Sequence, residues 1–376
     1  MPSRPPPTSL RGGSPSSRLE AGPVVREDPI ASESDFLDAI ERLHARGVTD
    51  GLPVIPPTAE LVARFVEAAG RSGNDLVAVV PPNMGRATVE KLAVNAVMAG
   101  ARPEYMPAIL AAVRAICAEP FALHGVAATT NSASPLLVIN GPVRKDLDVN
   151  GGAGAFGPGW RANATIGRTI RLVMLNLGGA RPGVISMSTF GHPGRYTYCI
   201  GEHEEASPWP PLHVERGFAA EDSTVAAYAG EAPHGVYDHR SRRGRQILNS
   251  IAASLGATWN VKLTGYGDTL VVVSPEHART LADDGWDKPR IRQYLWERCQ
   301  LPVRELCPDD EWGEGLPETV RAKFPDPTRE ETRIPKFRSP DNLIVIVAGG
   351  TAGRFSCVIP GFTFSGGSQL VIEKIA

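Results

Sequence analysis

The sequence predicts an α/β fold made of layered strand–helix units, with two related lobes as one possible arrangement. Short apolar runs closed by proline or turn residues, such as DLVAVVPP, PLLVING and TLVVVSP, are typical of buried strands. Segments with apolar residues at helical spacing lie between these runs, and this alternation is typical of α/β layers. A chain of 376 residues exceeds what one hydrophobic core usually serves. The length therefore favours two lobes.

The elements before residue 76 follow from capping and turn signals. Residues 1–31 are rich in Pro, Ser, Gly and Arg without the apolar core of a signal peptide, so we expect a disordered tail. The stretch SESDFLDAIERLHARG predicts a helix after Ser32 that ends at Gly47. The proline-rich connector TDGLPVIPPT follows, and Thr58 caps a second predicted helix.

A strand–helix pattern occurs twice in the chain. Residues 76–117 contain an apolar strand, a helix ending at a glycine and a second helix beginning near a proline, and residues 269–299 repeat this order. The repeat indicates either an internal duplication or the chance recurrence of a common unit. We divide the chain into an N-terminal α/β lobe over 32–240, with Gly-rich and His/Glu-rich loops, and a C-terminal α/β lobe over 241–376, with a Pro-rich linker at 307–340.

Composition and charge exclude several classes of protein. A formal charge of −2 and 21% charged residues give no polyanion-binding surface, so we expect neither nucleic acid nor membrane as a partner. The arginines of the RSRRGR stretch at 240–245 fit a solvated loop or a local anion contact. Five widely spaced cysteines without a CxxC pair indicate a reducing, cytoplasmic compartment. GGAGAFGPG matches neither a dinucleotide fingerprint nor a P-loop, so the cofactor stays unknown.

The Gly-rich stretch from Asn140 to Gly183 is the first candidate for ligand binding. Its glycines allow close approach of the backbone, and the helix that follows would point its first amides at the loop. Arg168 and Arg171, three residues apart, could bind a carboxylate or face water. A purely structural loop is the alternative. The predicted substrate-binding residues are Asn150, Gly151, Gly152, Arg161, Asn163 and Arg168.

The stretch from His192 to His239 supplies the candidate catalytic residues. Neighbouring carboxylates such as Glu204 and Glu205 would push their pKa values apart, giving an acid and a base, unless they belong to a solvated loop. Asp238 could orient an acid–base histidine, either His234 or His239. Cys199 has polar neighbours that could activate a thiol, although a buried, inert cysteine is the alternative.

A mixed metal site is the competing interpretation of the same stretch. His192, His234 and His239 could join a carboxylate between Glu202 and Glu205, but their spacing lacks the one-face pattern of H-E-x-x-H. We therefore predict no metal ligands.

Most of the chain after Asp50 resembles a large, poorly characterised bacterial family. The phrases that carry the resemblance are TDGLPVIPPT, ATVEKLAVNAVMAGARPEYMPAILAAV, NGGAGAFGPGWRANATIGR, EHEEASPWPPLHVERGF and PEHARTLADDGW. The resemblance implies an association with small UGSC-type (seleno)proteins, whose motif suggests thiol or selenol chemistry. This chain lacks that motif, since Phe355-Ser356-Cys357 has neither the glycine nor the first thiol. A redox pair would have to come from a partner.

Together these features predict an enzyme subunit that acts on a small polar or anionic substrate. A separate thiol- or selenol-bearing subunit would take part in a reductive, lyase-like or hydrolytic step. Two alternatives stay open. One is a stand-alone metal-dependent hydrolase or hydratase, and the other is a non-catalytic ligand-binding or scaffold subunit.

Overall fold

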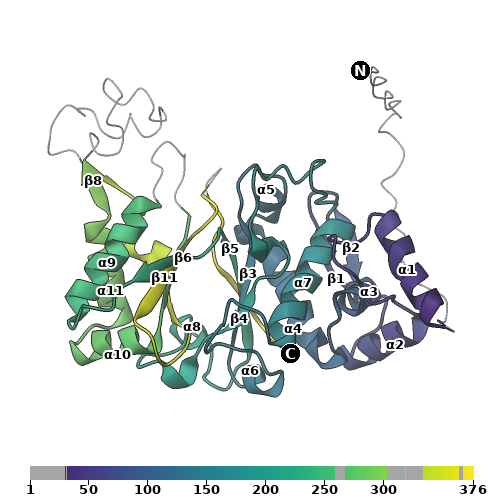
Figure 1. Ribbon diagram of the computed structural model, residues 1–376, viewed down its shortest axis with the longest axis horizontal. Coiled ribbons are helices and arrows are strands. Elements are labelled where there is room, and N and C mark those ends of the chain that lie inside the picture. Colours follow the sequence, from purple (N-terminus) through teal and green to yellow (C-terminus); the bar gives the residue numbers. More distant parts are fainter. Residues whose placement is uncertain (1–29, 31, 259–266, 303–317, 319–332, 364–366) are drawn as a thin grey trace, which may run out of the picture.

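The protein has four layers, in which two β-sheets pack face to face and helices cover both outer faces (Figure 1). The computed structural model describes residues 30, 32–258, 267–302, 318, 333–363 and 367–376. The predicted α/β class is confirmed. The predicted tail lies outside the described residues except for Ile30, as does most of the 307–340 linker.

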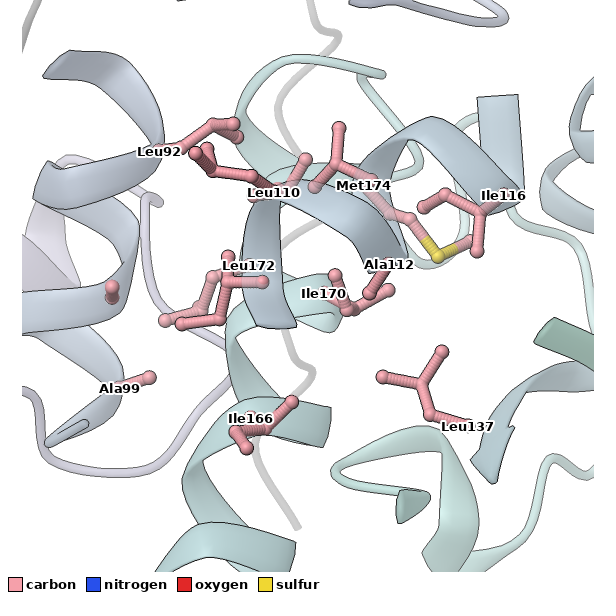
Figure 2. Packing of buried hydrophobic residues seen from close by; sticks show 14 of the residues in the cluster. Leu92, Ala99, Leu110, Ala112, Ile116, Leu137, Ile166, Ile170, Leu172 and Met174 are labelled. Atoms are coloured by element: carbon pink, nitrogen blue, oxygen red, sulfur yellow. The ribbon is translucent and has the colours of Figure 1, made fainter. Parts of the chain in front are cut away.

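The first sheet has the strand order β12-β5-β3-β4. β3 is parallel to β4 and antiparallel to β5, and β5 is antiparallel to β12. Its strands are β3 (Ser134–Asn140), β4 (Cys199–Gly201), β5 (Thr224–Gly230) and β12 (Val371–Lys374). The outer face packs on α4 (Met106–Cys117) and α7 (Arg161–Asn176), and α3 (Val89–Ala99) packs on these two helices. Figure 2 shows Leu137 of this face near Ile170 and Ala112.

The second sheet has the order β10-β7-β11-β6. β7 is parallel to β10 and antiparallel to β11, and β11 is antiparallel to β6. Its strands are β6 (His234–Tyr237), β7 (Thr269–Val273), β10 (Leu343–Val347) and β11 (Phe355–Pro360). The helices on its outer face are α9 (Gly244–Ala257), α10 (Pro275–Asp283) and α11 (Lys288–Arg298).

A third core fills the space between the sheets. Leu136 and Val138 of β3 pack there with residues of the second sheet such as Leu270 and Val272 of β7. The alternate residues of β3 face the helices. All seven residues of β3 are buried as a result. Burial on both faces explains why these strands appear as continuous apolar runs in the sequence.

The two sheets share one topology and exchange their fourth strands. In each half, one strand leads through helices to a second strand that is parallel to it, and a third strand then pairs antiparallel with the first. These strands are β3, β4 and β5 in the first half and β7, β10 and β11 in the second. The next strand then crosses over, so β6 ends the second sheet and β12 ends the first. Neither sheet is built from one continuous stretch of chain.

This symmetry is not the repeat expected from 76–117 and 269–299. β1 (Leu76–Val80) pairs with β2 (Gly85–Thr88) in a separate hairpin, whereas β7 lies in the centre of a sheet. The two strands have similar composition but different partners. Of the two alternatives, these different partners favour the chance recurrence of a common unit, and the structural equivalent of β7 is β3.

The remaining elements flank these layers. The predicted caps are present, since Ser32 accepts from Asp35 N–H at α1 and Thr58 accepts from Leu61 N–H at α2. These elements are α1 (Glu33–Ala45), α2 (Ala59–Ala68), α5 (Leu123–Ala127), α6 (Val143–Asp146), α8 (Leu212–Glu215), β8 (Gln300–Pro302) and β9 (Arg333–Pro335), with 3₁₀ turns at Pro103–Tyr105, Glu119–Phe121, Pro193–Arg195, Glu204–Ala206 and Pro340–Asn342. Within the described ranges no single helix has the length and apolarity to cross a membrane; one pair bent by 70°, Pro103–Cys117 with Glu119–Ala127, meets both criteria together.

Candidate anion-binding site

The Gly-rich loop is held by its own contacts. The Asn150 side chain accepts from Gly152 N–H and donates to Ala153 O, while Asn163 bonds both the N–H and the C=O of Asn150. A Cβ on Gly151 would lie 2.5 Å from Gly201 O, so glycine is needed there for close packing. These contacts favour the structural interpretation of the loop over a substrate-binding role.

Arg161 and Arg168 have structural partners rather than free guanidinium groups. Arg161 donates to the carbonyls of Gly100 and Ala101, which end α3. Arg168 forms two hydrogen bonds of 2.9 and 2.8 Å to the Asp50 carboxylate and also reaches the Leu52 and Pro53 carbonyls. Arg168 is therefore not placed as the sequence predicted for a substrate ligand, because Asp50 already pairs its charge.

The carboxylates after β4 form an ion network with Arg144. Glu204 accepts from Gly141 N–H at 2.7 Å, and Arg144 bonds Glu205 at 2.9 Å. Hydrogen bonds from Arg144 lower the pKa of Glu205 to about 2, while burial raises the pKa of the fully buried Glu202. The pKa values of Glu202 and Glu205 thus shift in opposite directions, but the main causes are burial and Arg144 rather than repulsion between neighbouring carboxylates. Glu205 stays ionised at neutral pH, so it cannot serve as an acid there.

Asp238 orients neither predicted histidine. Its carboxylate accepts from Ser241 and Ser250, and its backbone oxygen lies 3.1 Å from Nε2 of a buried histidine, His277. His234 and His239 are exposed. The predicted acid–base cluster is therefore wrong, because the Asp238 carboxylate is bonded to two serines and neither His234 nor His239 is its partner.

Cys199 is buried in the core of the first lobe. Burial raises the pKa of its thiol to about 12, so the predicted nucleophile would be a neutral thiol at pH 7. Among the described residues no three His, Cys, Asp or Glu side chains are placed to hold a metal ion.

A cavity of about 570 Å³ opens beside α7 and brings two other arginines together. Its lining includes Arg171, Arg195, His192, Ser186 and Ser188. Arg171 comes three residues after Arg168 on α7 and so points to a similar side of the helix. Arg195 ends the 3₁₀ turn that follows His192.

Neither guanidinium group forms an ion pair with a carboxylate among the described side chains. Arg171 donates to Ala180 O at 3.4 Å, and Arg195 donates to Ala133 O at 2.9 Å and Ser186 Oγ at 2.7 Å. Burial lowers the pKa of Arg171, and burial together with the Arg171 charge lowers the pKa of Arg195 to about 10. Both remain protonated at neutral pH in a partly dry site.

Neutral polar groups complete the cavity. Burial, and then the Arg195 charge, lower the pKa of His192, and its Nδ1 accepts from Gly194 N–H at 3.1 Å. The Ser188 Oγ is buried without a hydrogen-bond partner in the described part of the chain. Asp50 also lines the cavity and its charge partly offsets the effect of burial on the pKa of Arg171, but its carboxylate is already hydrogen-bonded by Arg168. The arrangement is suited to a small anion with hydrogen-bond acceptors.

The sequence held part of this signal. The sequence places Arg171 beside Arg168 as a possible carboxylate ligand, and His192 and Arg195 lie in the polar stretch, but nothing local distinguishes a paired arginine from an unpaired one. No family model, curated protein or solved structure matches this chain.

Proposed function

We propose that this protein is the substrate-binding subunit of an enzyme that acts on a small anionic molecule, held between Arg171 and Arg195. The observation that carries the proposal is the pair of part-buried guanidinium groups in one cavity with no carboxylate beside them except the already paired Asp50. Two like charges at low dielectric raise the free energy of the empty site. A bound anion would remove that cost.

A carboxylate fits this site well. Guanidinium groups bind carboxylates through two parallel hydrogen bonds, and such charge-assisted bonds are about twice as strong as neutral ones. Ser186 and Ser188 offer hydroxyl groups in the same cavity, and the neutral His192 adds no competing charge. The substrate class is thus a small molecule with at least one carboxylate or a group of similar shape.

A second subunit is part of the proposal. Apolar side chains stand exposed in the segment beside the cavity, with Phe190 at 92%, Val184 at 71% and Met187 at 51% exposure. Exposed apolar groups that cluster in this way are a common mark of an interaction surface. Burial raises the pKa of the described cysteines to about 12 for Cys117, Cys199 and Cys357 and about 11 for Cys299. None of these described cysteines is therefore an activated thiol, which supports a partner as the source of thiol chemistry.

The test is calorimetric titration of the full chain with acetate, malonate and inorganic phosphate. Arg171→Gln is the informative variant, since Arg171 makes one long hydrogen bond of 3.4 Å within the protein. Loss of one charged hydrogen-bonding group is worth roughly 1.5–3 kcal/mol, so affinity should fall about 10- to 150-fold. Exposed Arg86→Gln is the matched control. Equal binding by Arg171→Gln and Arg86→Gln would overturn the proposal.

A further inference from the structure

The outer edge of β6 is open. Asp238 N–H donates to Arg354 O across the β6–β11 pair, and the register joins Val236 to Ser356. Because strand positions alternate, the peptide groups of Gly235 and Tyr237 point away from β11. No strand pairs with that side within the residues that the structure describes. Two N–H and two C=O groups therefore lie along a free edge.

Little on β6 blocks this edge. Natural edge strands are usually protected by lysines, prolines or bulges. The β6–β11 register is continuous over its four residues, and a Cβ added to Gly235 would meet no atom within 4 Å. None of the four β6 residues is a lysine or a proline, and the strand has no bulge, so it lacks the usual features that keep another backbone from pairing.

A cluster of aromatic rings lies beside the same strand. The ring centroids of Tyr237, His239 and Phe355 are 4.5 to 5.3 Å apart, and Tyr237 is 72% exposed. Phe355 shares the inner face of the second sheet with Ile359, which packs against the first sheet. Phe355 and its cross-strand neighbour Tyr237 are exposed instead, so the first sheet leaves this end of the face uncovered.

Arginines border the aromatic cluster. Arg242 Nη1 donates to His239 O at 2.8 Å, and Arg354 Nη1 donates to Ser241 O at 2.8 Å. Exposed Arg240 follows His239 directly. Arg354 also forms an ion pair with Glu276 at 3.0 Å, so Arg240 and Arg242 supply the positive charge of this border, which is complementary to acidic groups in whatever covers the rings.

We infer that β6 is a docking strand for an extended, acidic segment of another protein. The segment would add to the sheet through the peptide groups of Gly235 and Tyr237, place apolar side chains on the rings and direct carboxylates toward Arg240 and Arg242. Aromatic residues and arginine are the side chains enriched at protein interfaces.

The test uses a fluorescein-labelled peptide of alternating valine and glutamate, titrated with the full chain and followed by anisotropy. Gly235→Pro removes one outward N–H and leaves the β11 side intact, so binding should weaken at least about tenfold. Gly235→Ala is the matched control and should bind like the wild type. In the wild-type complex, hydrogen exchange at the Gly235 and Tyr237 amides should slow. If Gly235→Pro does not fold, a peptide N-methylated at alternate residues removes the same bonds from the other side.

Three outcomes would overturn the inference. The first is unchanged binding by Gly235→Pro or by the N-methylated peptide, which would show that the edge is not used. The second is equal binding of a valine–lysine peptide, which would contradict the role of the arginines. The third is self-association of the wild type that Gly235→Pro abolishes, which would assign the edge to a second copy of the chain.

Discussion

Replacing Arg168 by alanine should unfold the protein more easily and also weaken anion binding. The Asp50 side chain is 2% exposed and the Arg168 side chain 15% exposed, and the pair is joined by two short hydrogen bonds. Removing the arginine leaves a buried carboxylate without a partner, which costs about 3–5 kcal/mol. The Leu52 and Pro53 carbonyls lose their donor as well.

The second effect follows from the position of Asp50 in the anion cavity. Once Arg168 is absent, Asp50 is the nearest available counter-charge for Arg171 in the same cavity. An internal carboxylate would then compete with the anionic ligand. Arg168→Ala should therefore lower the affinity for malonate even though Arg168 itself does not line the cavity.

Urea denaturation and calorimetry separate these effects. Adding Asp50→Asn to Arg168→Ala removes the unpaired charge, so the double variant should regain part of the lost stability and of the lost affinity. Exposed Arg86→Ala serves as the control for a lost surface charge. If Arg168→Ala unfolds at the control's urea concentration and only anion binding falls, Arg168 is a ligand residue, as the sequence suggested, and the ion-pair argument fails.

Three other properties can be checked directly. Iodoacetamide at pH 7 should leave Cys199 unmodified in the folded chain and modify it after unfolding, because burial raises its pKa to about 12. Deleting residues 371–376 should speed amide exchange in β5 but not in β11, since β12 pairs with β5 through ladder bonds of about 1 kcal/mol each. The folded pKa of Glu205 lies near 2, below its ordinary value of 4.5, so its contribution to stability is present above about pH 4.5 and disappears as the pH falls toward 2. Glu205→Gln should flatten that part of an acid-unfolding curve.

Local features of the fold were predictable, and pairings were not. Apolar runs and caps identified the strands β3 and β7 and the starts of α1 and α2, because burial and capping depend on neighbouring residues. β1 has the same kind of composition as β7 yet forms a hairpin with β2. The exchange of β6 and β12 depends on contacts between distant parts of the chain, which composition does not encode.

The same limit applies to the site. The residues of the proposed anion cavity lie within the stretches that the sequence singled out, since His192 and Arg195 lie in the polar stretch and Arg171 lies in the Gly-rich one. The sequence favoured Arg168 as a substrate ligand because its actual partner, Asp50, is 118 positions away and cannot be recognised from local sequence. It favoured Cys199 because its sequence neighbours are polar, whereas a strand side chain is surrounded by what lies across the sheet.

The connector between β5 and β6 joins the proposed anion cavity to the proposed docking strand. Only residues 231–233 separate β5 from β6. Glu231 accepts from the Asn131 side chain at 2.7 Å, Asn131 in turn accepts from Ala133 N–H at 2.7 Å, and Ala133 O holds Arg195 at 2.9 Å. A partner segment that fixes β6 would therefore restrain the connector that positions Arg195.

We expect the valine–glutamate peptide to change malonate affinity by roughly two- to tenfold, and malonate to change peptide affinity by the same factor. Asn131→Ala breaks the path between the sites without touching either ligand. Each ligand should still bind this variant, but neither should affect the other. Persistent coupling in Asn131→Ala would show that the sites communicate through another route, whereas its absence in the wild type would show that they are independent.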